Sequence, residues 1–139
     1  MYSEAGLYES VPATNGFTIA EDGDEITGPL TMRSFLYVLE RRHIWRLTFE
    51  QDPETDGAIF LAALRGCVNH RCVAVVDETA YMLDEQGVWA FSGGVGSESV
   101  SEQIQGLFRV DPVSKYKVNW AAQRFFHCVL YQPQEVIRW

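Results

Sequence analysis

The strongest constraint on the fold is a series of apolar segments in the middle of the chain. Cys72-Val73-Ala74-Val75-Val76 is apolar throughout, which is typical of a central strand buried on both faces. Tyr81-Met82-Leu83 and Val88-Trp89-Ala90-Phe91 flank Asp84-Glu85-Gln86-Gly87, and this pattern predicts a hairpin whose glycine takes a positive φ. The middle of the chain is therefore expected to form a β-sheet.

Three other segments carry signals of a helix. The first predicted helix covers about 29–42, because apolar residues recur there at i, i+3, i+4 and i+7; they are Met32, Phe35, Leu36 and Leu39. An aspartate cap and a closing glycine predict a second helix over about 57–65. Ser99 and Glu102 match a capping box and predict a third helix after them.

Two further strands are expected on either side of this region. Residues 45–49 alternate apolar and polar side chains, and residues 124–131 form a last strand before the C-terminal tail. A short strand is also expected over 17–20. Taken in order, these elements predict an α+β fold, with a mixed, mainly antiparallel sheet and about three helices packed on it.

The length of 139 residues suits one domain. Residues 1–26 contain an acidic run and little periodicity, so we expect an N-terminal arm, partly flexible, ahead of a single α+β domain over 27–139.

The charge balance limits the classes of partner. Nineteen acidic residues against eleven basic ones give a formal net charge of −8, which disfavours nucleic acid and anionic membrane surfaces. The sequence shows no secretory signal and no apolar run of the roughly 18 residues that a membrane span needs. An odd count of three cysteines indicates the cytoplasm or another reducing compartment.

The stretch NHRCVAVVDETAYMLDEQG contains the best candidate for chemistry. His70 opens one predicted strand and Asp84 closes the next, so antiparallel pairing could bring the imidazole and the carboxylate together. In the alternative interpretation, His70 is a loop residue and Asp84 opens a turn, a position that aspartate favours.

The order of these elements, with a His-led strand and an Asp-ended strand, resembles the second half of papain-like peptidases, especially the Josephin deubiquitinases and the bacteriocin-processing peptidases. The resemblance covers roughly residues 28–132 and implies that His70 is a general base oriented by Asp84. In that family the nucleophilic cysteine lies well upstream of the histidine, whereas no cysteine precedes Cys67 here. The resemblance therefore implies an inactive remnant or one part of an assembled site.

A second resemblance concerns RCVAVVDETAYML, which looks like the Walker B strand of additional-strand ATPases. That resemblance implies that Asp77 orders Mg²⁺ and that Glu78 polarises water, as in a nucleotide-binding remnant. The chain has no G-x-x-x-x-G-K-[ST] phosphate cradle, however, and two acidic residues at the end of an apolar strand are common without ATP.

A zinc site is the third possibility. Cys67, His70 and Cys72 lie within six residues, and His127-Cys128 could complete the set, but this spacing matches no regular zinc motif. Buried thiols that act as small apolar groups are the simpler interpretation. We therefore expect no metal and no cofactor.

Trp120 and Trp139 lie in irregular or terminal segments, where large aromatic side chains often serve as interface anchors. Together with the incomplete catalytic motifs and the acidic balance, they favour a non-catalytic protein-binding domain, either a subunit of an assembly or a small effector. Its expected partner is another protein or a further copy of the chain. The degenerate or split peptidase and the nucleotide-binding remnant remain as alternatives.

Overall fold

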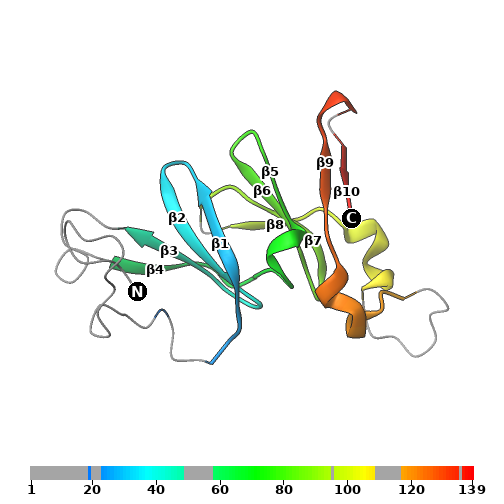
Figure 1. The fold of residues 1–139 in the computed structure, drawn as a ribbon, viewed down its shortest axis with the longest axis horizontal. Helices are drawn as coiled ribbons and strands as arrows, with labels where there is room; N and C mark the ends of the chain where they lie inside the picture. Colours follow the sequence, from blue (N-terminus) through cyan, green and yellow to red (C-terminus); the bar gives the residue numbers. More distant parts are fainter. Residues whose placement is uncertain (1–18, 20–22, 49–57, 95, 109–116, 135) are drawn as a thin grey trace, which may run out of the picture.

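The computed structural model describes residues 19, 23–48, 58–94, 96–108, 117–134 and 136–139. Its first sheet consists of four antiparallel strands in the order β1-β2-β3-β4 (Figure 1). Their bounds are Ile26–Met32 for β1, Phe35–Glu40 for β2, Ile44–Thr48 for β3 and Ala58–Ala63 for β4. Each strand pairs with its neighbour in the chain, so this sheet is a meander.

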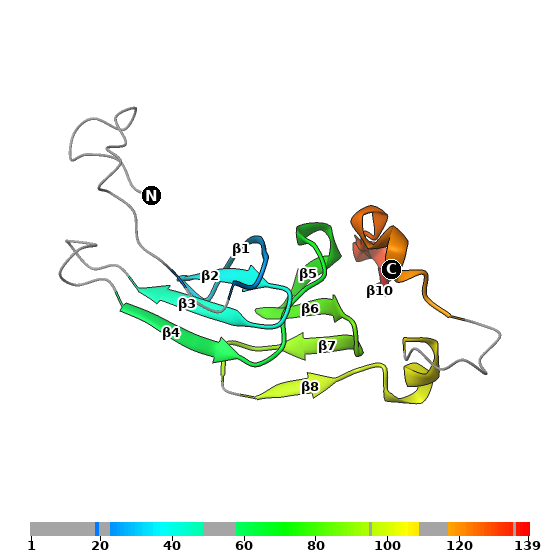
Figure 2. The ribbon, with the colours of Figure 1, turned by 90° about the horizontal axis from the view of Figure 1, so that it is seen from below.

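A second meander follows, with the order β5-β6-β7-β8. The 3₁₀ turn η1 (His70–Cys72) leads into β5 (Val73–Val76), β6 (Thr79–Asp84), β7 (Gly87–Phe91) and β8 (Ser97–Ser99). Figure 2 shows the two sheets next to each other, and the order of the strands runs the same way in both, from β1 to β4 in the first and from β5 to β8 in the second.

In the described residues from 101 onward, the elements are short. The 3₁₀ segments are η2 (Glu102–Leu107), η3 (Trp120–Phe125) and η4 (Gln132–Gln134). The strands β9 (Val129–Tyr131) and β10 (Val136–Arg138) form a separate two-stranded antiparallel sheet.

The core lies between the two four-stranded sheets. The rings of Tyr37 and Phe91, one from each sheet, meet edge to face with centroids 5.3 Å apart. Trp89 is fully buried, and its indole Nε1 donates a hydrogen bond of 3.0 Å to the carbonyl of Gly66. Because aromatic rings from both sheets share this interior, the sheets are held to each other by apolar contact as well as by the connecting chain.

Two of the hairpins turn on two residues with positive φ. Arg33 and Ser34 connect β1 to β2 with φ of 51° and 65°, and Asp77 and Glu78 connect β5 to β6 with φ of 46° and 58°. Two left-handed residues in succession match the twist of the flanking strands, so such turns close tight hairpins. These hairpins lack the glycine or asparagine that usually marks a turn of this kind.

The predicted α+β fold with three packed helices is wrong, because the described chain is mainly antiparallel β-sheet. The segment 29–42 forms β1, its two-residue turn and β2, and the segment 57–65 contains β4. The capping box does not begin an α-helix: β8 ends at Ser99, and a kinked 3₁₀ segment begins at Glu102.

Several predicted strands are confirmed. The segment expected over 45–49 is β3, and the expected hairpin is β6 and β7, with Gly87 at φ 128°. The strand expected over 72–76 is β5, but it lies at the edge of its sheet and not at the centre. Of the segment 124–131, only the last three residues form a strand. The short strand expected over 17–20 falls almost wholly outside the described residues, and so does most of the N-terminal arm.

Candidate functional site

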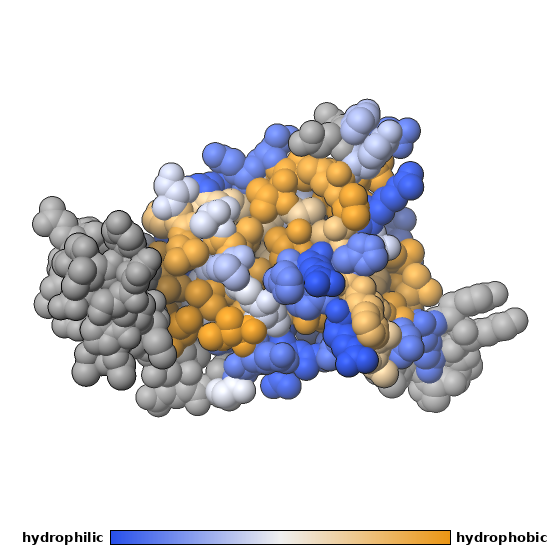
Figure 3. Space-filling view, viewed as in Figure 1, coloured by the Kyte–Doolittle hydropathy of each residue, from blue (hydrophilic) through white to orange (hydrophobic). Residues whose placement is uncertain are grey.

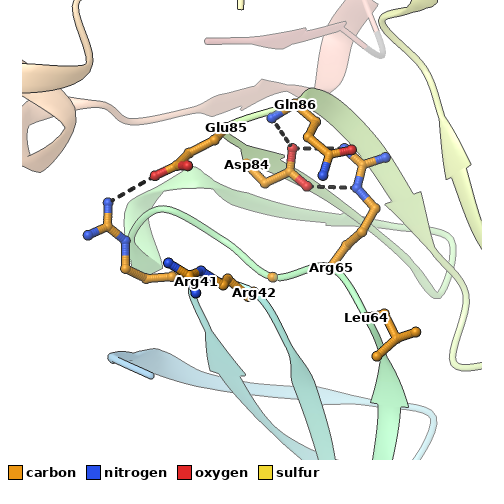
Figure 4. A pocket seen from close by; sticks show the side chains of 8 residues that line it. Arg41, Arg42, Leu64, Arg65, Asp84, Glu85 and Gln86 are labelled. Carbon is orange, nitrogen blue, oxygen red and sulfur yellow. Dashed lines mark hydrogen bonds and ion pairs between the residues drawn. The ribbon is translucent and has the colours of Figure 1, made fainter. Parts of the chain in front are cut away.

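A polar pocket of about 280 Å³ surrounds the predicted site residue Asp84 (Figure 4). It lies where the β2–β3 turn, the β4–β5 connection and the β6–β7 turn meet. Arg65 donates to Asp84 from Nε at 2.7 Å and from Nη2 at 2.8 Å. Both side chains are largely buried, at 14% and 7% exposure, and the Arg65 guanidinium lies over the ring of Trp89 at 5.1 Å.

The carboxylate of Asp84 thus links the β6–β7 turn to the β4–β5 connection. Its Oδ1 also accepts a hydrogen bond of 2.8 Å from the backbone amide of Gln86, which closes the β6–β7 turn. Beside it, Glu85 pairs with Arg41 of the β2–β3 turn at 3.5 Å. These contacts connect the turns of the two sheets where the sheets meet.

The structure places His70 apart from this pocket. His70 is exposed in η1, and its Cβ packs against Gly28 of β1 so closely that a side chain at Gly28 would have to displace it. The hydrogen bonds of Asp84 go to Arg65 and Gln86, and no hydrogen bond joins it to His70. The pairing that the papain-like resemblance implies is not formed in this conformation.

The side chains of Cys67 and Cys72 are buried, and that of Cys128 is partly buried. Burial is the main cause that raises the pKa of Cys67 and that of Cys72 from 9.0 to about 12. Burial also raises the pKa of Cys128. The Sγ of Cys67 donates to the carbonyl of Asn69 at 3.0 Å. A nucleophile or a zinc ligand needs the thiolate, so these sites favour the neutral, structural form of the thiol.

Asp77 and Glu78, the residues of the Walker B resemblance, form an exposed turn between antiparallel strands. Glu78 pairs with Arg33 of the other left-handed turn at 3.3 Å. This ion pair joins the two hairpins at their tips.

Asp24, Glu40 and His43 are the one group of three metal-compatible side chains in the described part of the chain, with donor atoms within 4.8 Å of one another. His43 Nδ1 lies 3.7 Å from Asp24 Oδ2 and 3.6 Å from Glu40 Oε2. A divalent cation could accept this mixture of donors. However, the same carboxylates accept hydrogen bonds from the Arg42 amide and the Trp45 indole, which accounts for their position as supports of the β2–β3 turn.

A larger and more apolar groove, of about 410 Å³, lies between the second sheet and the C-terminal segments. Its lining combines residues of β6 and β7 with residues far along the chain: Leu83, Val88, Ile104, Phe108, Val118, Phe125, Phe126, His127 and Trp139. Ile104, Phe125 and Trp139 remain 50%, 64% and 42% exposed, respectively. Figure 3 shows apolar side chains on the side of the molecule that carries β9, β10 and the segment after β8.

The two tryptophans predicted as anchors differ in their surroundings. Trp139 lines the groove and is partly exposed. Trp120 packs against Phe108 and Phe126, and its Nε1 donates to the carbonyl of Phe108 at 3.2 Å. Trp120 therefore packs against two of the side chains that line the groove, whereas Trp139 is itself part of the exposed lining.

The groove itself was not predicted from the sequence. Its exposed members lie in three separate segments, and the sequence pattern assigns Ile104 to a predicted helix and Phe125 to a predicted strand, so it gives no sign that they share a surface. None of the helical segments in the described ranges has the length and apolar character of a membrane span. A comparison with known protein families and with curated proteins finds no match to this chain.

Proposed function

We propose that this chain is a non-catalytic domain that binds another protein through the C-terminal groove. The observation that carries the proposal is the exposure of Ile104, Phe125 and Trp139 around one apolar hollow. Contiguous apolar surface of this kind is costly in water and marks interaction sites in monomeric proteins. Aromatic side chains at the centre of such a surface contribute most to binding.

The chemistry of the described side chains supports a binding role over a catalytic one. The thiols of Cys67 and Cys72 are neutral near pH 7, and Asp84 is occupied by Arg65. The groove contains one titratable side chain, His127, whose Nδ1 lies 3.3 Å from the carbonyl of Phe125. These groups are better suited to forming a contact surface than to acting as an activated nucleophile.

The charge of the chain indicates the chemistry of the partner. With a net charge of −8, the domain attracts a positively charged protein and repels an acidic one. We therefore infer that the groove takes an apolar segment of a partner whose surrounding surface is basic. Binding of this kind weakens as salt concentration rises, because screening acts on the long-range charge attraction.

The test is site-specific photo-crosslinking in the source cells. A photoreactive phenylalanine analogue at Phe125 is expected to give one discrete adduct, identified by mass spectrometry. The same analogue at Phe60, which lies on β4 and is 47% exposed against 64% for Phe125, is expected to give none.

The purified adduct partner then allows a titration. Phe125→Asp is expected to weaken binding by tenfold or more, since central aromatic residues contribute about 2 kcal/mol or more. Phe60→Asp serves as the matched control and leaves affinity unchanged. Equal crosslinking from both positions, or equal affinity of the two variants, would contradict the proposal.

A further inference from the structure

Three thiols from separate parts of the chain lie near η1. Cys67 belongs to the β4–β5 connection, Cys72 ends η1, and Cys128 directly precedes β9. All three are free thiols; Cys67 and Cys72 are buried, and Cys128 is partly buried. Thiols that lie close together can be oxidised to a disulfide, provided that their backbone positions allow the bond.

A backbone hydrogen bond places Cys128 next to Cys72. The amide of Cys128 donates to the carbonyl of Arg71 at 2.8 Å, and Arg71 directly precedes Cys72. With standard backbone dimensions, this bond sets the Cα atoms of Cys72 and Cys128 about 4–7 Å apart, which is the range that a disulfide spans. The two thiols also influence each other. The pKa of Cys72 is raised first by burial and next by Cys128, whose thiolate would repel a second negative charge.

The segment before β9 is held in this position by the side chain of Asn69. Its Nδ2 donates to the carbonyl of Gln123 at 2.7 Å and to that of Phe126 at 3.1 Å, while its Oδ1 accepts from the amide of Arg71 at 2.8 Å. Figure 1 shows this segment beside the short coil that precedes β5. The two thiols are therefore kept close to each other without a covalent bond between them.

We propose that Cys72 and Cys128 form a redox-sensitive disulfide, in which Cys128 reacts with the oxidant and Cys72 then displaces the product. Cys128 reacts first because its side chain is partly exposed, whereas that of Cys72 is fully buried. Cys67 is less suited as the partner, because its Sγ donates to the carbonyls of Asn69 and Cys72.

The oxidant is hydrogen peroxide, and atoms and electrons balance in two steps. The sulfur of Cys128 attacks one peroxide oxygen, so that an S–O bond forms, the O–O bond breaks and water leaves; the product is a sulfenic acid. The sulfur of Cys72 then attacks the sulfur of Cys128, so that the S–S bond forms, the S–O bond breaks and a second water leaves with the Cys72 proton. The two thiols lose two electrons in total, and one peroxide is reduced to two waters.

The pKa values of the two thiols set the conditions for this reaction. Burial raises both, so the reactive thiolate is scarce at neutral pH and the first step is slow. The second step is helped by proximity, because it is intramolecular. We therefore expect the disulfide under sustained oxidation and not as a permanent part of the fold. Its formation attaches the chain just after Phe125 and Phe126, which line the groove, to the start of the second sheet.

Peptide mapping of the full chain after treatment with hydrogen peroxide tests the proposal. Trypsin cleaves after arginine and lysine, so each cysteine falls into a peptide of its own: Cys67 into 66–71, Cys72 into 72–109 and Cys128 into 125–138. The expected product is a linked pair of the peptides 72–109 and 125–138. The intact mass is expected to fall by about 2 Da, the two hydrogens lost. One thiol is expected to react with N-ethylmaleimide after denaturation, and dithiothreitol is expected to restore all three.

Two variants serve as controls for the mapping. Cys67→Ser is expected to form the same linked pair, whereas Cys128→Ser is expected to form none. A linked peptide that contains residues 66–71, oxidised cysteines without a link, or three reactive thiols after treatment of the wild-type chain overturns the proposal. The decisive result comes from the wild-type chain, so it does not depend on the folding of a variant. A chain that crosslinks to a partner from Phe125 but never links Cys72 to Cys128 overturns the disulfide and leaves the proposed function intact.

Discussion

Arg65 and Asp84 meet fork to fork: two nitrogens of the guanidinium donate to the two carboxylate oxygens, and both side chains are largely withdrawn from water. Arg65 belongs to the connection that leaves the first sheet, and Asp84 ends β6 in the second. The pair therefore fixes the position of one sheet relative to the other, as a bidentate hydrogen-bonded pair can do with little freedom of orientation.

The first prediction concerns this pair. Asp84→Ala leaves a buried guanidinium without its counter-ion, and we expect the free energy of unfolding to fall by about 3–5 kcal/mol. Urea denaturation measures the change. His70→Ala is the control: because His70 is exposed, its loss is expected to change stability by no more than about 0.5 kcal/mol. An Asp84→Ala variant as stable as the unmodified protein would contradict the role given to the ion pair.

A second prediction concerns Gly66, next to Arg65. A Cβ at this position would collide with the carbonyl oxygen of Glu40, which is backbone and has little room to move. Gly66→Ala is therefore expected to lower the melting temperature markedly or to prevent folding. Gly94→Ala is the matched control, because a Cβ there meets nothing within 4 Å. Thermal unfolding followed by circular dichroism distinguishes the two, and an unchanged melting temperature for Gly66→Ala would contradict the packing described.

The third prediction is a loss of stability at alkaline pH. Burial holds the pKa of Cys67 and of Cys72 at about 12, whereas the unfolded chain releases these protons near the ordinary value of 9.0. Below pH 9 both states keep the protons, so the thiols add no pH dependence. Above pH 9 only the unfolded state loses them, and the free energy of unfolding is expected to fall by about 1.4 kcal/mol per pH unit for each thiol.

Urea titrations between about pH 8 and pH 10 test this slope, because the range lies across the unfolded-state thiol pKa. Cys67→Ala is the comparison variant. It is expected to start less stable because of the cavity it creates, but to lose less stability with pH. Parallel curves for the two proteins would show that the thiols are not the source of the pH dependence.

The fourth prediction concerns the groove. A dye that fluoresces on apolar surfaces, such as anilinonaphthalene sulfonate, is expected to bind the folded chain at the groove. Phe125→Asp places a charge among the apolar lining and is expected to reduce the fluorescence severalfold, whereas Phe60→Asp changes it little. Equal signals from both variants would locate the dye elsewhere and remove the main support for a groove.

The predictable part of the fold is the part with local signals. The hairpin of β6 and β7 carries apolar strands on both sides of a turn that ends in glycine, and Gly87 does take a positive φ. The four residues of β5 are apolar and three of them are β-branched valines, which is typical of a strand. In both cases the sequence pattern and the tertiary structure favour the same element.

The first predicted helix shows why other parts could not be predicted. Met32 and Phe35 have helical spacing, but the structure pairs them across a two-residue hairpin. The turn residues, Arg33 and Ser34, adopt a left-handed conformation that nothing in their identity signals. The apolar spacing is therefore a coincidence of two strands separated by a short turn.

The candidate site could be predicted only in fragments. The sequence pattern predicts Trp139 as an interface anchor and Asp84 as a site residue, and the structure places Trp139 in the groove and Asp84 in the polar pocket. The groove joins Leu83, Ile104 and Phe125, which lie about twenty residues apart in the chain, so no local pattern contains it. To predict a surface that is assembled from separate segments, one must know how the fold brings those segments together.

The order of the strands has a consequence for how the chain folds. Every strand of each sheet pairs with a strand next to it in the sequence, so pairing closes short loops and costs little chain entropy at each step. Folding can then advance from the N-terminus during synthesis, with the first meander forming before the residues of the second have been made. Tyr37 has no aromatic partner from the second sheet until β7 has formed, so the first sheet is expected to remain loosely packed until then and to become rigid when the second is added.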